Sequence, residues 1–296
     1  MDMRTLKYIS SLLCCSAALM ACSSEEETMD CEEKVPLEIT IGNGTRSIIE
    51  GTTIPYQTSF GIYGVDGYGY RAIDNLSVFY DGNCKLSQDV YLGKSYMLIK
   101  AYYPYSAEIK DYIANIDIRD QIDFLYGNAV DSYGFPDKID RSNPKATISF
   151  KHALSRITFK VKHTEAYGED FTLSSLFISP IYLTADYNVY SQTITKRQLN
   201  EPTFKIDRTI TKEFTSFDLL MIPLDENDHP RWIMFSDENG SIGNTTIEGE
   251  WKAGQQYTYE VTFDDNGIKI SEAVITPWET TTLSQIDITD DNLVTK

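Results

Sequence analysis

The sequence predicts an all-β protein built from two β-sandwich domains in tandem. Apolar and polar residues alternate over many short segments, which is typical of strands buried on one face. Turn-forming residues separate these segments, and no segment has the periodicity of a long amphipathic helix. The 296 residues include 20 tyrosines and 13 phenylalanines, and aromatic side chains favour strands. This length exceeds what one sandwich usually needs, which favours two domains.

The N-terminal 21 residues have the features of a signal peptide. Arg4 and Lys7 precede an apolar run from Tyr8 to Met20. This run is too short to span a bilayer as a helix, but its length suits the core of a signal peptide. The sequence beyond it contains no apolar run of about 18 residues, so we expect no other membrane-spanning segment.

A lipoprotein motif ends the signal peptide. The segment Leu19-Met20-Ala21-Cys22 resembles the lipobox of bacterial lipoproteins, in which the leader is removed and the cysteine is acylated. Cys22 is therefore the expected lipid attachment point. Several acyl chains make a lasting anchor, because each buried methylene contributes about 0.8 kcal/mol. An ordinary secretory leader that is cut elsewhere is the alternative.

An acidic tether is expected over residues 22–34, where the sequence is polar and without periodicity. Its run Ser23-Ser24-Glu25-Glu26-Glu27 resembles the surface-export signal of Bacteroidetes lipoproteins. A solvated tether without a signalling role is the alternative. The expected location is the outer-membrane surface, with the lipid as the anchor before any maturation.

The mature chain is strongly acidic. The whole sequence has a formal net charge of −18, and removal of Asp2, Arg4 and Lys7 with the leader leaves 24 basic and 43 acidic residues, a charge of −19. Such a surface repels nucleic acid and anionic lipid headgroups. We therefore expect no nucleic-acid partner.

Two cysteines remain once the leader is removed and Cys22 is acylated. They are Cys31 and Cys84. An oxidising compartment would permit a disulfide between them, and two unpaired thiols are the alternative. Neither lies near a histidine in the sequence and no Cys-x-x-Cys occurs, so we expect no metal site at either.

The first ordered segment is predicted as a strand over residues 35–41, in which apolar and polar side chains alternate. Pro36 lacks an amide hydrogen, and its place near the start suits an edge or first strand. Gly42-Asn43-Gly44 ends the strand with turn-forming residues. The apolar residues are Val35, Leu37, Ile39 and Ile41.

The first sandwich is expected over residues 35–145. Residues 61–70 are rich in glycine and tyrosine, but they lack the lysine and the following helix of a phosphate-binding loop, so we predict a mobile hairpin tip. The pattern over residues 115–127 is mixed, and residues 117–120 fit either a turn or a short helix. Further strands are expected over residues 60–64, 76–80 and 96–103.

A polar segment over residues 137–145 predicts the domain boundary, so that the second sandwich covers residues 146–296. Asn266-Gly267 follows one strand and precedes another, which is a strong hairpin signal. Strands are expected over residues 146–150, 157–161, 173–183, 214–222, 232–235, 257–263 and 268–270.

Five motifs resemble, in the same order, those of the Mfa-like fimbrillin family of Bacteroidetes. They cover nearly the whole mature chain. The resemblance implies two transthyretin-like β-sandwiches and a subunit of type V fimbriae that is exported as a lipoprotein and used in adhesion. The motifs are Tyr102-Tyr103-Pro104-Tyr105, Asp123-Phe124-Leu125-Tyr126-Gly127, the run from Ser149 to Ile157, the run from Trp251 to Tyr259, and Ile275-Thr276-Pro277-Trp278.

The resemblance also implies assembly with other fimbrial subunits by strand exchange after proteolysis. A trypsin-like or arginine-specific protease would cut at Arg46, in the turn after the first strand, and so make residues 35–41 removable. The C-terminal arm, residues 274–296, would supply the donor strand. The alternatives are a permanent first strand and a disordered C-terminal tail. The apolar residues of the arm are Leu283, Ile286 and Ile288.

No motif for catalysis, a cofactor or a metal is visible, so we do not expect an enzyme. His152 is predicted to be a hydrogen-bonded structural residue, and His163 and His229 are predicted to lie on the surface. The acidic segments 225–228 and 264–267 fit plain turns better than calcium loops.

A different class of function is the main alternative. A stand-alone surface lipoprotein would bind a host protein or glycan through exposed aromatic residues such as Tyr63, Tyr68 and Tyr70. The three tryptophans are expected to pack in the core or at its rim rather than to form a carbohydrate platform. They are Trp232, Trp251 and Trp278.

Overall fold

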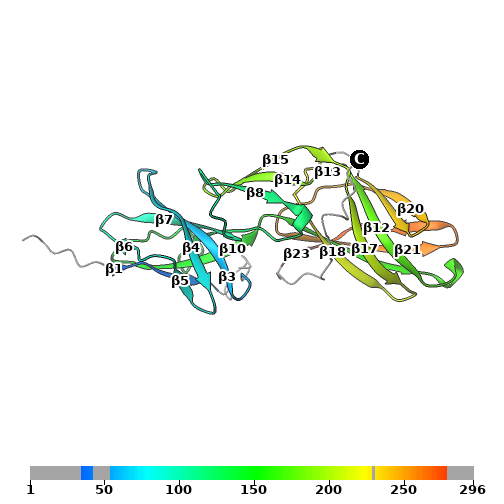
Figure 1. Ribbon diagram of the computed structural model, residues 1–296, viewed down its shortest axis with the longest axis horizontal. Helices are drawn as coiled ribbons and strands as arrows, with labels where there is room; N and C mark the ends of the chain where they lie inside the picture. Colours follow the sequence, from blue (N-terminus) through cyan, green and yellow to red (C-terminus); the bar gives the residue numbers. More distant parts are fainter. Residues whose placement is uncertain (1–34, 43–53, 229–230, 279–296) are drawn as a thin grey trace, which may run out of the picture. The chain divides into compact units, whose positions relative to one another are not determined.

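The computed structural model describes residues 35–42, 54–228 and 231–278 (Figure 1). Most of these residues lie in strands, so the prediction of an all-β protein is confirmed. Within these ranges no helix is long and apolar enough to span a membrane. The described residues all belong to one structural unit, and the division of the chain into two transthyretin-like domains stays a prediction.

The helices of the described residues are two short 3-10 helices, η1 (Ile118–Asp120) and η2 (Glu165–Tyr167). η1 lies in the segment that, from the sequence, fitted either a turn or a short helix. Asp117 precedes it, and its carboxylate accepts a hydrogen bond from the Arg119 amide at 3.0 Å, which satisfies one free amide of the helix start.

The first large element is a seven-stranded sheet. Its neighbouring strands are antiparallel except β2 and β10, which are parallel. The two edge strands, β2 and β5, approach each other until their Cα atoms lie within 8 Å, so the sheet curls until its edges face each other. The strands in spatial order are β2 (Glu38–Ile41), β10 (Lys145–His152), β9 (Leu125–Ala129), β7 (Met97–Tyr103), β3 (Thr58–Asp66), β4 (Arg71–Tyr80) and β5 (Cys84–Leu86).

β10 corrects one sequence expectation. The strand over residues 146–150 was expected to open the second sandwich, but it pairs with β9 and β2 in the seven-stranded sheet. The polar segment before it is a connection at that sheet, because Ile139 forms a bridge with Met97 of β7. Alternating side chains predict a strand but do not tell which sheet it joins.

The remaining strands form two larger and three smaller sheets. A short pair joins β1 (Val35–Pro36) to β6 (Tyr91–Leu92), and another joins β13 (Ile181–Tyr182) to β16 (Leu199–Asn200). A three-stranded sheet has the order β15 (Thr193–Lys196), β14 (Thr184–Asn188), β8 (Ile113–Asp117). The four-stranded sheet has the order β17 (Thr203–Ile210), β12 (Phe171–Ser179), β19 (Arg231–Asp237), β20 (Gly240–Ile247). The five-stranded sheet has the order β18 (Thr215–Met221), β11 (Ser155–His163), β21 (Gln255–Asp264), β22 (Gly267–Ile270), and β23 (Val274–Pro277) also pairs with β21.

The five-stranded and four-stranded sheets face each other as a β-sandwich. Phe159 of β11 and Phe263 of β21 contact Phe235 of β19, with ring centroids 6.1 and 5.7 Å apart. These rings lie in the larger of two apolar cores. The smaller core belongs to the seven-stranded sheet and includes Phe60 and Phe150, which meet edge to face at 5.4 Å.

Candidate functional site

The first strand of the described chain changes partner part-way along its length. Val35 and Pro36 form β1, which pairs antiparallel with β6. The Leu37 amide donates to the Val90 carbonyl oxygen at 2.8 Å. From Glu38 onward the chain pairs in parallel with β10 as β2. One continuous segment, which we call the tie strand (residues 35–41), therefore closes two separate edges.

The tie strand pairs with β10 through one side only. The Glu38 amide donates to the Pro144 carbonyl oxygen at 2.9 Å, and the Gly42 amide donates to the Ile148 carbonyl oxygen at 2.8 Å. Alternate residues of a strand direct their backbone groups to opposite sides, so the amide and carbonyl of Ile39 point away from β10. Over the described part of the chain, no strand pairs with that outer side of β2.

Two of the four apolar residues of the tie strand are deeply buried. Leu37 is 4% and Ile39 is 6% exposed, and both belong to the smaller core. Val35 and Ile41 are half-buried. Full burial of such a side chain contributes about 1.5 to 3 kcal/mol, so this pair contributes roughly 3 to 6 kcal/mol as an upper estimate. A whole domain is stable by only about 5 to 15 kcal/mol.

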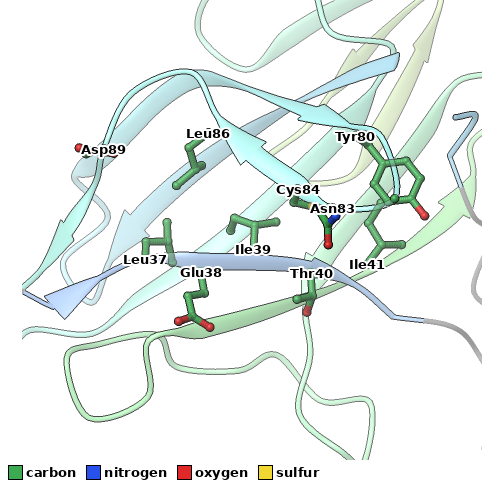
Figure 2. A pocket seen from close by; sticks show the side chains of 11 residues that line it. Leu37, Glu38, Ile39, Thr40, Ile41, Tyr80, Asn83, Cys84, Leu86 and Asp89 are labelled. Carbon is green, nitrogen blue, oxygen red and sulfur yellow. The ribbon is translucent and has the colours of Figure 1, made fainter. Parts of the chain in front are cut away.

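A hollow of about 550 Å³ lies beside the tie strand. Figure 2 shows Ile39 pointing toward Cys84 and Asn83, whereas the side chains of Glu38 and Thr40 project from the opposite face of β2. The walls come from the tie strand on one side and from the β4–β5 turn and β5 on the other. The lining residues are Leu37, Glu38, Ile39, Thr40, Ile41, Tyr80, Gly82, Asn83, Cys84, Leu86 and Asp89.

The hollow offers strand edges and apolar side chains rather than reactive groups. Tyr80, Cys84 and Leu86 pack against the smaller core from the wall opposite β2. Burial raises the pKa of the Cys84 thiol to about 11, so the thiol stays protonated near neutral pH and is a weak nucleophile. The chemistry of this site therefore suits another β-strand, which can add backbone hydrogen bonds and side chains together.

Alkylation of Cys84 at pH 8 is expected to be faster, by up to about 100-fold, in a chain that begins after Arg46 than in the chain that keeps the tie strand. Loss of the strand removes part of the burial that raises the thiol pKa to about 11; at a pH below both values, a full return to the ordinary pKa of 9.0 would give roughly 100-fold more thiolate, which is the upper limit. Mass spectrometry of iodoacetamide adducts in a Cys31→Ser background measures the rate, and Cys84→Ser gives the baseline. Equal rates in the two chains would contradict the placement of Cys84 in the wall of the hollow that faces the tie strand.

The C-terminal end of the described chain is fixed by Trp278. β23 pairs with β21 at the edge of the five-stranded sheet, although Val274 and Ile275 remain 61% and 56% exposed. Trp278 is buried and stacks on His152 with the ring centroids 3.6 Å apart. The His152 Nδ1 atom lies 2.6 Å from the Asp123 carboxylate. Residues 274–278 are therefore part of the folded unit.

Comparison with known families decides what kind of chain this is. A model described as fimbrillin-like matches residues 45–278. The chain belongs to the fimbrillin-like family. The match begins just after the tie strand and ends at Trp278, so it spans most of the described residues of this fimbrillin-like chain.

Solved structures share the fold of the fimbrillin-like chain. A proposed cell adhesion protein from Bacteroides uniformis is 18% identical, with a TM-score of 0.65, and the match covers 83% of this chain and 99% of that one. A second, from Bacteroides ovatus, is 15% identical with a TM-score of 0.63, covering 83% and 98%. The tip fimbrial protein Mfa3 from Porphyromonas gingivalis is 9% identical with a TM-score of 0.51, covering 83% and 100%. Comparison with curated proteins finds no match.

Several predicted site residues lie outside the described residues of the fimbrillin-like chain. They include the lipidation residue, the cleavage residue and the apolar residues of the C-terminal arm. The alternative of a disordered C-terminal tail is wrong for residues 274–277, which form β23 and pair with β21. Cys84 forms no disulfide within the described chain. The residues outside the described ranges are Cys22, Cys31, Arg46, His229, Leu283, Ile286 and Ile288.

The histidines divide into a confirmed and a wrong prediction. His152 is buried and bonded to Asp123, as predicted for a structural residue. His163 was predicted to lie on the surface, but it is 1% exposed, and its Nε2 atom lies 2.9 Å from the Asp170 carboxylate. Its place two residues after the buried Val161 in β11 was the available signal, because alternate residues of a strand share a face.

The aromatic residues also divide between the core and the surface. Tyr63 was expected to be an exposed binding residue, but it is completely buried. Trp251 and Trp278 are buried and Trp232 is half exposed, in agreement with packing in the core or at its rim. Tyr68 and Tyr70 are highly exposed, as expected.

The carboxylates of the acidic turns bind groups of the chain itself. Asp225 and Asp228 pair with the Lys196 ammonium at 2.6 and 3.0 Å, and the Asp264 carboxylate accepts the Asn266 amide at 2.9 Å. Among the residues that the structure describes, no group of three or more histidine, cysteine, aspartate or glutamate side chains is placed to hold a metal ion.

Proposed function

We propose that this chain is a structural subunit of a cell-surface fimbria that joins its neighbours by strand exchange. The observation that carries the proposal is the tie strand, a single edge strand that closes two edges and covers part of the smaller core. Membership of the fimbrillin-like family supports it, as does the fold shared with a tip fimbrial protein. The same family supports a location at the cell surface and a role without catalysis.

Removal of the tie strand would create two defects at once. The edge of β10 would lose the hydrogen bonds that its carbonyl groups now accept, and unpaired strand edges readily accept another strand. The sites of Leu37 and Ile39 would open the smaller core to water, at a cost of several kcal/mol. A strand from another subunit would relieve both defects by pairing with β10 and filling the apolar sites.

Proteolysis would control this exchange. Arg46 lies four residues after Gly42, whose amide makes the last backbone bond of the tie strand with Ile148. A cut at Arg46 would leave the strand attached to the fold by its own contacts alone, and it would separate the fold from the lipid. The family match beginning at residue 45 agrees with a shared unit that starts near this place.

The C-terminal arm is the proposed donor. Trp278 fixes its start on the described fold through His152, and the arm that follows carries Leu283, Ile286 and Ile288. Ile286 and Ile288 have the two-residue spacing of Leu37 and Ile39, as strands with one buried face require.

Electron microscopy of the purified mature chain tests the proposed function. Incubation with an arginine-specific protease is expected to convert monomers to filaments, because cleavage makes the tie strand removable. The matched control is the same preparation without protease. Monomers that persist after complete cleavage would contradict strand exchange and favour a stand-alone surface lipoprotein.

Cys22 is proposed as the lipid attachment point that holds the chain at the outer membrane before cleavage. Metabolic labelling with a radioactive fatty acid is expected to lose at least nine-tenths of its signal in Cys22→Ala, because no other residue of the lipobox offers a thiol. Cys31→Ala is the matched control and should keep its label. Label that survives Cys22→Ala would remove this residue from the proposal.

A further inference from the structure

Two hairpin loops of the seven-stranded sheet share one five-residue design. Residues 66–70 read Asp-Gly-Tyr-Gly-Tyr, and residues 131–135 read Asp-Ser-Tyr-Gly-Phe. In each loop one oxygen of the aspartate accepts the amides two and four residues later, at 2.9 and 2.9 Å in the first loop and at 2.8 and 3.0 Å in the second. We call them the twin loops.

The backbone of the twin loops is also the same. In both, the aspartate amide donates to the carbonyl of the last residue, at 3.0 and 2.8 Å, and the glycine amide donates to the aspartate carbonyl at 3.0 Å. Gly69 and Gly134 have φ angles of +87° and +83°, which glycine adopts without steric cost. The two loops therefore hold the side chains that lie two and four residues after the aspartate in matching positions.

Each twin loop presents two aromatic rings to solvent. Tyr68 is 88% and Tyr70 is 73% exposed, and Tyr133 is 81% and Phe135 is 68% exposed. These are the four highest values for large hydrophobic residues over the described chain. The loop geometry needs the aspartate and the glycine but no ring at either aromatic position. Because both loops expose aromatic rings that their geometry does not require, we infer that these rings have a binding role.

The twin loops leave the sheet at the same end, from β3 and β9, which flank β7. Asp66 pairs with Met97 at the start of β7, and Ile139, in the segment that leaves the second loop, forms a bridge with the same Met97. Tyr96 lies between them, since a side chain at Gly67 would meet its ring and the Lys138 ammonium lies 4.6 Å from the ring centroid. Two strand spacings separate the bases of the loops, which is roughly 10 Å.

The charge of the twin loops limits the ligand. Neither loop contains a lysine or arginine, and each contains one aspartate that uses a single carboxylate oxygen within its loop. The whole chain has a net charge of −18. Asp66 and Asp131 outnumber Lys138, the cation beside Tyr96 between the loops, so an anionic ligand, such as a sialylated or sulfated glycan, would be repelled. A neutral ligand with hydroxyl groups would find a hydrogen-bond acceptor next to an aromatic face.

We propose that the twin loops bind a neutral oligosaccharide. The apolar face of a pyranose ring packs on an aromatic ring while its hydroxyl groups donate to a neighbouring carboxylate, and each twin loop offers both groups within five residues. The closed loops lose little conformational entropy on binding. The separation of their bases suits a chain of several sugar units that contacts both loops.

Binding of neutral hexasaccharides to the mature chain tests the proposal. The probes are cello-, manno- and xylohexaose, with sialyllactose and a heparin tetrasaccharide as anionic comparators, and titration calorimetry measures affinity. At least one neutral probe is expected to bind, and Tyr68→Ala and Tyr133→Ala should each weaken it at least tenfold. Tyr56→Ala is the matched control, because Tyr56 is 65% exposed outside both loops.

Three results would overturn the proposal. They are no binding of any neutral probe, preference for an anionic probe, and neutral binding that both loop variants leave unchanged. Self-association of the chain that Tyr68→Ala abolishes, without sugar binding, would assign the rings to a protein contact instead. Circular dichroism confirms that each variant is folded. The loop variants should still form filaments after proteolysis, so that a failure of sugar binding can be distinguished from a failure of strand exchange.

Discussion

Replacing Arg46 with alanine is expected to hold the protein as a lipidated monomer whose N-terminus stays at Cys22. The uncut tie strand remains connected to the fold, so any strand that displaces it must compete with a segment at very high effective concentration. It also keeps Leu37 and Ile39 in the smaller core. N-terminal sequencing and electron microscopy after exposure to the protease measure both consequences, and filaments are expected to fall below about one-tenth of the unchanged protein.

Arg46→Lys is the informative control for this variant. A trypsin-like protease cuts after lysine and would restore filaments, whereas an arginine-specific protease would not. The pair of variants thus separates the two classes of protease. Normal filaments from Arg46→Ala would show that assembly needs no cut at this residue.

Truncation after Trp278 is expected to abolish polymerisation while leaving the monomer folded. The shortened chain keeps β23 and the stacking of Trp278 on His152, so its melting temperature should stay within about 2 °C of the full chain. It lacks Leu283, Ile286 and Ile288, which are the proposed apolar contacts of the donor strand. Electron microscopy and calorimetry measure the two properties.

Two further variants sharpen the truncation experiment. Serine at residues 283, 286 and 288 together keeps the chain length but removes the apolar side chains, and it should also stop polymerisation. Truncation after Ala273 removes β23 and Trp278 as well, and it should destabilise the fold by about 3 to 5 kcal/mol, as loss of a buried tryptophan does. Polymerisation by the chain that ends at Trp278 would exclude the arm as donor.

The strands themselves were predictable because most are half-buried and alternate in hydrophobicity. The tie strand, β10, β11 and β21 all follow this pattern, and Asn266-Gly267 correctly predicted the β21–β22 hairpin. Which sheet a strand joins was not predictable. β10 lies in the first sheet because it pairs with β9 and β2, and long-range pairing leaves no mark in the sequence of one strand.

The candidate site was predictable in part. Alternation identified the buried face of the tie strand, and the structure confirms it for Leu37 and Ile39. The hollow was not predictable, because it depends on the curl that brings β5 toward β2. Tyr63 shows a related limit, since the bulged pairing of β3 with β4 around this residue and its burial depend on neighbours that the sequence pattern does not identify.

The twin loops carry a local signal in the sequence, of which only the first copy led to a prediction. Residues 61–70 were predicted as a mobile hairpin tip. Residues 61–66 instead belong to the mostly buried strand β3, and only residues 67–70 connect β3 to its partner β4. The repeat of the pattern aspartate, any residue, tyrosine, glycine, aromatic residue at positions 131–135 was visible without a structure. Short patterns of this kind fix a turn through nearby atoms, so they can be recognised locally.

The change of partner at Leu37 determines what can replace the tie strand. A one-residue insertion at this point would leave Val35 beside Leu92 but would turn Ile39 and Ile41 to the opposite face, because successive side chains alternate. Any substitute strand must therefore be in register with β6 before this point and with β10 after it. Selectivity among incoming strands therefore rests on length and phase over the whole segment rather than on one side chain, and a strand that is a single residue out of phase would satisfy one edge and leave the other open.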